Sequence, residues 1–234
     1  MKLIEINEQH FLRVLQTNDN GGGNKVNESL LKLFKCLSDQ SSVYEVSIKV
    51  AALNQLYSTA IQFIEPVVEK IVEEYPVSCD LTVDEWVKLV DNTRKVEWVS
   101  KRTDKPHKRN NLSFSSKYVH FLSKYEVPIY DSYVWLVMVG YLNQKGLSEY
   151  SFTKTPKTYA EFYDVFKIFK EKFQLERVIA NSLGEEKNLP DNYYIDKYLW
   201  QYGKELVDST MANEDVSLDT AKRRLAKSMK ISVG

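Results

Sequence analysis

The sequence contains few of the residues from which metal sites and disulfides are built. Its 234 residues include two cysteines, Cys36 and Cys79, and three histidines, His10, His107 and His120. The cysteines do not form a Cys-x-x-Cys pair and the histidines are scattered, so no spacing typical of a zinc site occurs. We expect neither a metal nor any other cofactor, and the low cysteine content favours a reduced, cytoplasmic setting.

Long apolar runs and an excess of one charge are also missing. No apolar run approaches the roughly twenty residues that a membrane-spanning helix requires, so we expect no membrane association. The first residues, MKLIEINEQHFLRVL, have acidic side chains where a signal peptide has apolar ones. Basic and acidic residues number 32 each, so the formal net charge is zero. Any binding to nucleic acid must therefore come from a local patch.

Apolar side chains recur with the helical period along most of the chain, and no segment alternates convincingly with the period of a strand. We therefore predict an all-α fold of about nine or ten helices. The chain is expected to form one domain, residues 1–234, which could divide into lobes at 28–100 and 110–210. Helices are predicted at residues 1–15, 28–38, 43–64, 65–75, 83–99, 159–181 and 219–229, with one more that ends at Gly203. A flexible glycine-rich loop is predicted at 18–27, and a polar C-terminal tail at 211–234.

Residues 110–142 are the stretch around which the rest of the chain is arranged. One face of a first helix is formed by residues at helical spacing, Tyr118, Phe121, Leu122 and Tyr125. Pro128 is expected to end that helix, because its ring disfavours helical geometry at the preceding residue. The run that follows is apolar nearly all round, which predicts a central, buried second helix with Asp131 as its N-cap.

Two side chains in this stretch could carry chemistry. Lys117 is predicted in the first turn of the first helix, and Asp131 at the start of the second. A lysine among apolar neighbours loses its proton more easily, and a carboxylate at a helix N-terminus is held ionised. An amine that attacks a sugar carbon, next to a carboxylate that stabilises the developing positive charge, can cleave an N-glycosidic bond. Equally, Lys117 could be a solvated helix residue and Asp131 only an N-cap.

The segments SSKYVHFL and VPIYDSYVW resemble the active-site segment of the helix-hairpin-helix DNA glycosylase superfamily, especially bacterial proteins with an 8-oxoguanine-glycosylase-like fold. In that superfamily a hairpin leads into a helix that carries a lysine, and an aspartate caps the next helix. The resemblance implies that Lys117 forms a Schiff base with the sugar and that Asp131 stabilises the transition state. It also implies double-stranded DNA as the partner, with the target base flipped into an aromatic-lined pocket.

A basic segment precedes the Lys117 helix and is expected to form a loop, because it contains Pro106. Next to the candidate site, this loop could bind DNA phosphates through its cationic side chains, Lys101, Arg102, Lys105, Lys108 and Arg109. The alternative is an ordinary solvated surface loop. The hairpin that the resemblance implies corresponds to residues 111–115, where Ser113 and Ser115 would contact a phosphate.

Two functions of different classes therefore remain open. One is a base-excision type of DNA glycosylase, favoured by the basic loop and by Lys117 with Asp131. The other is a non-catalytic helical binding or scaffold module that keeps only the fold. The second is favoured by the zero net charge and by residues 111–115, which have no glycine where the superfamily has a Gly-x-Gly hairpin.

Overall fold

The computed structural model describes residues 2–20, 22–76, 80–100, 103–147 and 155–230. Within these ranges the fold is all-α, as predicted: eleven α-helices accompany one short 3₁₀ helix and a single two-stranded ribbon. None of the helices in the described ranges is both long and apolar enough to cross a bilayer.

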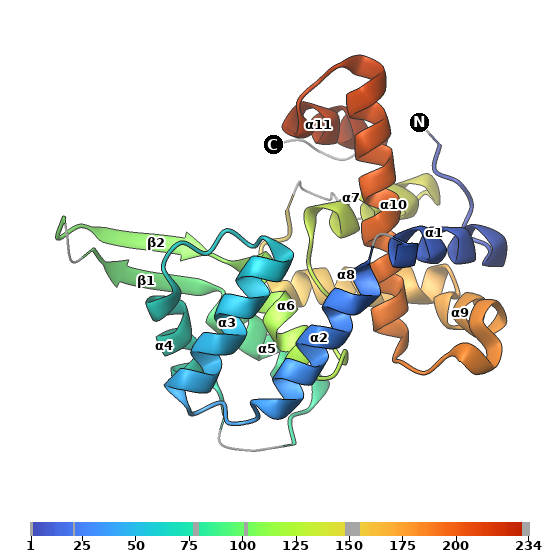
Figure 1. Cartoon of the computed structure of the whole chain (residues 1–234). Coiled ribbons are helices and arrows are strands. Elements are labelled where there is room, and N and C mark those ends of the chain that lie inside the picture. The colour runs from blue at the N-terminus through green and yellow to red at the C-terminus, as the bar shows by residue number, and fades with distance from the viewer. Residues whose placement is uncertain (1, 21, 77–79, 101–102, 148–154, 231–234) are drawn as a thin grey trace. The chain divides into compact units, whose positions relative to one another are not determined.

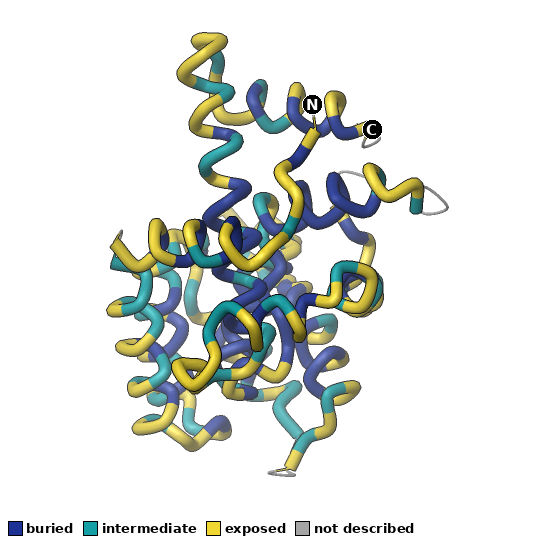
Figure 2. Tube along the Cα trace, turned by 90° about the vertical axis from the view of Figure 1, so that its right-hand side faces the viewer, coloured by how far each residue is buried: buried dark blue, intermediate teal, exposed yellow. Residues whose placement is uncertain are grey.

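The chain forms two compact units, whose elements are labelled in Figure 1. Unit 1 is built from the three segments Met1–Gly22, Tyr130–Lys157 and Glu161–Gly234. Unit 2 is built from the two segments Gly23–Ile129 and Thr158–Ala160. Around the helices in Figure 2, buried residues alternate with exposed ones, as the helical period of the sequence predicts.

Unit 2 contains five helices and the ribbon. The helices are α2 (Gly23–Cys36), α3 (Val43–Tyr57), α4 (Ile64–Glu74), α5 (Val83–Thr93) and α6 (Leu112–Leu122). Helix α6 is buried on nearly every side and packs against α2, α3 and α5. It ends at Leu122, before the predicted stop at Pro128, because Lys124 and Tyr125 take positive φ angles of 53° and 75°.

Local side-chain bonds fix the starts of two helices of unit 2, α3 and α5. The hydroxyl of Thr82 accepts from the backbone N–H of Glu85, whose carboxylate accepts from the backbone N–H of Thr82 at 2.7 Å. This capping box begins α5 at the predicted position. Ser42 caps α3 through the N–H of Glu45.

Unit 2 also contains the first residues of α8 (Tyr159–Lys172). The carboxylate of Asp91 accepts from the backbone N–H groups of Tyr159, at 2.8 Å, and Ala160, at 3.0 Å. The side chain of Tyr159 is fully buried, and its hydroxyl donates to the carbonyl of Pro128 at 2.5 Å. These bonds join the start of α8 to the rest of unit 2.

A two-stranded ribbon projects from the helices of unit 2 (Figure 1). Its strands, β1 (Lys95–Val99) and β2 (Pro106–Asn110), are antiparallel, with Lys95 opposite Asn110. The buried guanidinium of Arg94 fixes its base, because it pairs with Asp91 at 2.7 Å and bonds Asn110 at 3.3 Å. The prediction of a helix at 83–99 is therefore wrong beyond Thr93, where α5 ends, and the prediction of a loop at 101–109 is wrong from Pro106, where β2 begins.

Unit 1 contains six helices and the short 3₁₀ helix at Gly184–Glu186. Besides most of α8, they are α1 (Glu8–Asn20), α7 (Ser132–Gln144), α9 (Leu175–Leu183), α10 (Asp191–Glu214) and α11 (Leu218–Ser228). Helix α10 packs against α1, α7, α9 and α11. Helix α7 is buried from Val134 to Leu142, as predicted, and it ends before Gly146, whose φ is 75°.

Gly203 lies inside α10 and does not end a helix, contrary to the prediction. A Cβ atom at this position would lie 2.8 Å from Cβ and 2.9 Å from the carbonyl oxygen of Tyr133, at the start of α7. The absence of a side chain therefore permits α7 and α10 to approach closely. This glycine inside a helical sequence therefore serves close packing and is not a stop signal.

Other boundaries also differ from those predicted. The loop expected at 18–27 is mostly helical, because α1 continues to Asn20 and α2 begins at Gly23. The helix expected at 43–64 ends at Tyr57, and α4 begins at Ile64. The helix expected at 159–181 is two helices separated at Gln174, whose φ is 48°. The expected C-terminal tail contains the end of α10 and the predicted basic helix, α11.

Candidate functional site

Lys117 lies in the second turn of α6, one turn later than predicted, because α6 begins at Leu112. Only 4% of the residue is exposed. Its ammonium donates a hydrogen bond of 2.6 Å to the hydroxyl of Ser113 and lies 5.6 Å from the ring centre of Tyr57. Lysine is rarely buried to this extent, so the residue is an unusual element of unit 2.

Asp131 is the N-cap of α7, as predicted. Its carboxylate accepts a hydrogen bond of 2.9 Å from the backbone N–H of Tyr133. Asp131 belongs to unit 1 and Lys117 to unit 2. The joint catalytic role of the two residues therefore stays a prediction.

Residues 111–115 form the N-cap and first turn of α6, and not the hairpin that the resemblance implies. Ser113 accepts the hydrogen bond of Lys117, and Ser115 is 1% exposed. The hydroxyl of Ser115 has no hydrogen-bond partner among the described residues. Neither serine is presented on an exposed hairpin, so the implied phosphate contact at this segment has no geometric support.

A second buried lysine, Lys49 of α3, was not predicted as a site residue. It is fully buried, and its ammonium donates to the side-chain oxygen of Gln40 at 2.7 Å and to the carbonyl of Leu37 at 3.0 Å. The hydroxyl of Tyr118 donates to the same Gln40 oxygen at 3.0 Å. The side-chain oxygen of Gln40 thus accepts hydrogen bonds from two buried donors.

The spacing of α3 did contain a signal for Lys49. The residue shares a helical face with Val46, Val50 and Leu53, all of which are buried. A lysine on an apolar stripe is expected to be buried with it, where a neutral amine is favoured.

Burial lowers the pKa of two basic side chains in unit 2, Lys49 and His120. Burial lowers the pKa of Lys49 from 10.5 to about 8, and the carboxylates of Glu45 and Asp39 only partly oppose this shift. Burial also lowers the pKa of His120 to about 4, although its Nδ1 donates to the carbonyl of Val127 at 2.6 Å. A part of Lys49 is therefore a neutral amine near pH 7, which is the reactive form in Schiff-base chemistry.

The two lysines contact one aromatic cluster. Phe121 packs against Phe34 and Tyr57, with ring centres 5.7 Å and 5.9 Å away. The ammonium of Lys49 lies 5.8 Å from the ring centre of Phe34, and that of Lys117 faces Tyr57. Phe34, Tyr57 and Phe121 are called the aromatic cluster below.

A cavity of about 1180 Å³ opens next to the aromatic cluster within unit 2. Phe34 and Phe121 line it together with Trp86, Tyr75 and Gln40. Its volume exceeds the range of about 300–1,000 Å³ that is usual for small-molecule sites, and polar and charged side chains also line it. Lys117 does not line the cavity. Its ammonium faces Tyr57, whose ring packs against Phe121, and Phe121 lines the cavity.

The ribbon carries the described part of the predicted basic segment. Trp98 of β1 and His107 of β2 are cross-strand partners whose rings stack at 5.3 Å, and Phe63 adjoins Trp98 at 5.5 Å. Lys108 is exposed and forms an ion pair of 2.8 Å with Glu97. Lys105 is exposed and Arg109 is half-buried. Lys101 and Arg102 lie outside the described residues.

A scan against protein-family models finds one match, over residues 8–126, to the family HI_0787_N, described as an N-terminal domain. The matched segment begins with α1 and includes all five helices and the ribbon of unit 2. Searches among curated proteins and among solved structures return no match.

Proposed function

The chain belongs to the HI_0787_N family, and on the geometry of unit 2 we propose that the protein binds double-stranded DNA through the β1–β2 ribbon. The observation that carries this proposal is the charge of the ribbon. Residues 95–110 contain six basic and two acidic residues, a net charge of +4, whereas the whole chain has a net charge of zero. The remaining 218 residues therefore have a net charge of −4, so the ribbon is far more basic than the chain as a whole and can attract a polyanion.

The form of the ribbon supports the same proposal. The major groove of DNA is wide enough to admit a two-stranded β-ribbon, and several DNA-binding proteins use one in this way. Lys108 and Glu97 form an exposed ion pair, which contributes little to stability, so Lys108 can exchange its partner for a phosphate. The stacked pair of Trp98 and His107 stiffens the ribbon and adds flat surface.

A salt titration of duplex binding tests the proposal. The variant Lys105→Gln, Lys108→Gln, Arg109→Gln removes three positive charges from the ribbon. Each phosphate contact contributes about 0.9 to the slope of log K against log salt, so three lost contacts reduce that slope by about 2 to 3. Fluorescence anisotropy with a labelled duplex between about 50 and 200 mM salt measures both slopes.

The matched control removes the same number of charges from α11 and the two residues that follow it, through Arg223→Gln, Lys227→Gln and Lys230→Gln. All three side chains are exposed and lie in unit 1. The control should retain the wild-type slope. An unchanged slope in the ribbon variant, or an equal loss in both variants, would show that the ribbon does not contact the phosphates.

Lysine-based cleavage of an N-glycosidic bond is a second candidate function, proposed for unit 2 with Lys117 as nucleophile. It is supported by the burial of Lys117 beside the aromatic cluster. The cavity that adjoins this cluster is large enough for a flipped base, and four aromatic side chains help to line it, Phe34, Tyr75, Trp86 and Phe121. The competing hypothesis is a non-catalytic binding module. The two differ in one outcome, because only a lysine nucleophile forms a covalent intermediate with the sugar.

A further inference from the structure

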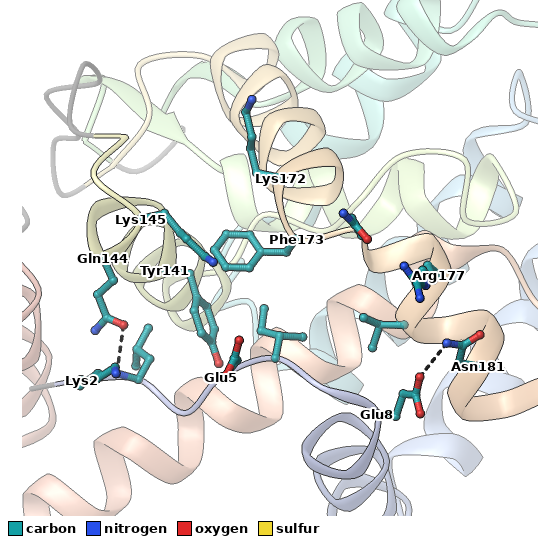
Figure 3. A pocket seen from close by; sticks show the side chains of 14 residues that line it. Lys2, Glu5, Glu8, Tyr141, Gln144, Lys145, Lys172, Phe173, Arg177 and Asn181 are labelled. Atoms are coloured by element: carbon teal, nitrogen blue, oxygen red, sulfur yellow. Dashed lines mark hydrogen bonds between the residues drawn. The ribbon is translucent and has the colours of Figure 1, made fainter.

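Unit 1 has a cavity of its own, which the DNA-binding proposal does not use. It has a volume of about 510 Å³, within the usual range of small-molecule sites. Figure 3 shows its walls: the chain segment before α1, the C-terminal end of α7, and the residues where α8 gives way to α9. All of its lining residues belong to unit 1.

The cavity is held in shape by hydrogen bonds between its walls. Gln144 accepts from the backbone N–H of Leu3 at 3.2 Å, and the buried Tyr141 donates to the carbonyl of Ile4 at 2.7 Å. Asn181 of α9 donates to the carboxylate of Glu8 at 2.6 Å. The segment before α1 is therefore fixed against both α7 and α9, so the cavity is formed before any ligand enters.

Cationic side chains outnumber carboxylates in this cavity. Four cations line it, Lys2, Lys145, Lys172 and Arg177, against the two carboxylates of Glu5 and Glu8. Within the described parts of the chain, none of the four cations forms an ion pair with a carboxylate. All four are exposed to solvent, which screens them from one another, and each can pair with an anion that enters the cavity.

We propose that this cavity binds a small phosphorylated metabolite that also carries hydroxyl groups. A phosphate monoester carries a charge of roughly −1.5 to −2 at pH 7, which cations that line the cavity can balance. The guanidinium of Arg177 can donate two parallel hydrogen bonds to phosphate oxygens. Lys145, whose ammonium lies 5.7 Å from the ring centre of Phe173, supplies a second charge.

The carboxylate of Glu5 is the reason why we expect hydroxyl groups on the ligand. Its side chain lines the cavity beside Tyr141 (Figure 3) and has no hydrogen-bond partner among the described residues. A free carboxylate would repel a bare phosphate but accepts hydrogen bonds from the hydroxyls of a sugar. The cavity therefore distinguishes a sugar phosphate from inorganic phosphate.

Calorimetric titration of the full chain tests this proposal with three probes, ribose 5-phosphate, ribose and inorganic phosphate. Ribose 5-phosphate should bind saturably and more tightly than inorganic phosphate, and ribose should not bind. The variant Lys145→Gln, Arg177→Gln should weaken binding of ribose 5-phosphate by about tenfold or more, because charged hydrogen bonds are lost. The variant Arg223→Gln, Lys227→Gln removes the same charges from α11 and should bind as the wild type does.

The variant Glu5→Gln tests whether the carboxylate selects a ligand with hydroxyl groups. It should reduce the preference for ribose 5-phosphate over inorganic phosphate, because inorganic phosphate gains from the loss of a negative charge. Absence of saturable binding by ribose 5-phosphate, or equal weakening by the α11 variant, would overturn the proposal. Duplex binding by the Lys145→Gln, Arg177→Gln variant should equal that of the wild type, which separates this site from the ribbon.

Discussion

Lys49 donates a hydrogen bond of 2.7 Å to the side-chain oxygen of Gln40, and no carboxylate among the described residues pairs with its ammonium. The hydroxyl of Tyr118 completes the arrangement through a 3.0 Å bond to the same oxygen. A buried ammonium held only by neutral acceptors is costly, and its neutral form is favoured. The protein therefore contains an amine whose charge depends on pH in a range where exposed lysines do not change.

The lowered pKa of Lys49 predicts that the free energy of unfolding rises with pH above about 8. The pKa of Lys49 is about 8 in the folded protein against an ordinary 10.5, so between these values the folded state has lost a proton that the unfolded state keeps. Unfolding then takes up a proton, and the free energy of unfolding increases with pH. Urea denaturation at pH 7.5 and 9.5 should show a gain of about 1 to 2 kcal/mol that Lys49→Met lacks.

The comparison stops at pH 9.5 because buried tyrosines act in the opposite direction. Burial raises the pKa of Tyr118 well above its ordinary value, so stability is lost once unfolded tyrosines ionise above about pH 10. Lys49→Met keeps these tyrosines and isolates the lysine. The same gain in the wild type and in Lys49→Met would mean that Lys49 is protonated normally.

Covalent trapping tests which of the two buried lysines, if either, is the nucleophile. Borohydride should reduce a Schiff base between Lys117 and duplex DNA that carries a damaged base, leaving a stable adduct visible by electrophoresis. Lys117→Ala should abolish the adduct, whereas Lys49→Met should retain it. Thermal melting of Lys117→Ala verifies that the variant folds.

Two other results of the trapping experiment would lead to different conclusions. An adduct that survives Lys117→Ala but not Lys49→Met would assign the chemistry to Lys49. No adduct from the wild type over a panel of damaged duplexes would rule against a lysine nucleophile. The non-catalytic binding module would then be the better description.

Substitution of Asp131 separates a capping role from an electrostatic one. Asp131→Leu should cost about 1 kcal/mol, because the N–H of Tyr133 loses its acceptor. Asp131→Asn should leave stability nearly unchanged, since asparagine is also a good N-cap. Urea denaturation measures both, and Ser42→Ala at the N-cap of α3 should cost a similar amount to Asp131→Leu.

The same pair of variants tests catalysis. If the charge of Asp131 stabilises the transition state, Asp131→Asn should lower the yield of trapped adduct while the protein stays folded. A stable Asp131→Asn protein with full adduct formation would leave Asp131 with a capping role only.

Gly203→Ala should destabilise the protein by about 1 to 3 kcal/mol, because the added methyl meets the backbone of Tyr133 and the helices must shift. Ser209→Ala is the matched change on the exposed face of the same helix and should be nearly neutral. Urea denaturation of both variants provides the comparison. A loss below about 0.5 kcal/mol for Gly203→Ala would mean that α7 and α10 are not closely packed at this point.

Features encoded by neighbouring residues could be predicted from the sequence. The buried helix α7, the Asp131 cap, the Thr82–Glu85 capping box and the final helix each depend on residues a few positions apart. The ribbon could not be predicted in this way, because it depends on pairing across a turn and on the bond between Arg94 and Asn110. The packing role of Gly203 could not be predicted either, because Tyr133, the residue that approaches it closely, lies seventy positions earlier in the sequence.

The candidate site was predicted only in part. Lys117 stood out because it lies in a conspicuous apolar helix. Lys49 did not, although its helical spacing from Val46 and Leu53 placed it on a buried stripe. The role of Gln40 as the common acceptor was not predictable, because Tyr118 lies far from it in the sequence and only the packing of unit 2 joins them.

Because Asp91 caps α8, the hydrogen bonds of this cap limit where the chain can be cut to make an expression fragment. A chain truncated after residue 129 would lose Tyr159, and the void left by a fully buried aromatic ring costs about 3 to 5 kcal/mol. The carbonyl of Pro128 would lose its donor, and Asp91 would lose two of its hydrogen bonds. Unit 2 is thus not encoded by one continuous stretch, and an expression fragment meant to isolate it must supply residues 158–160 through an engineered linker.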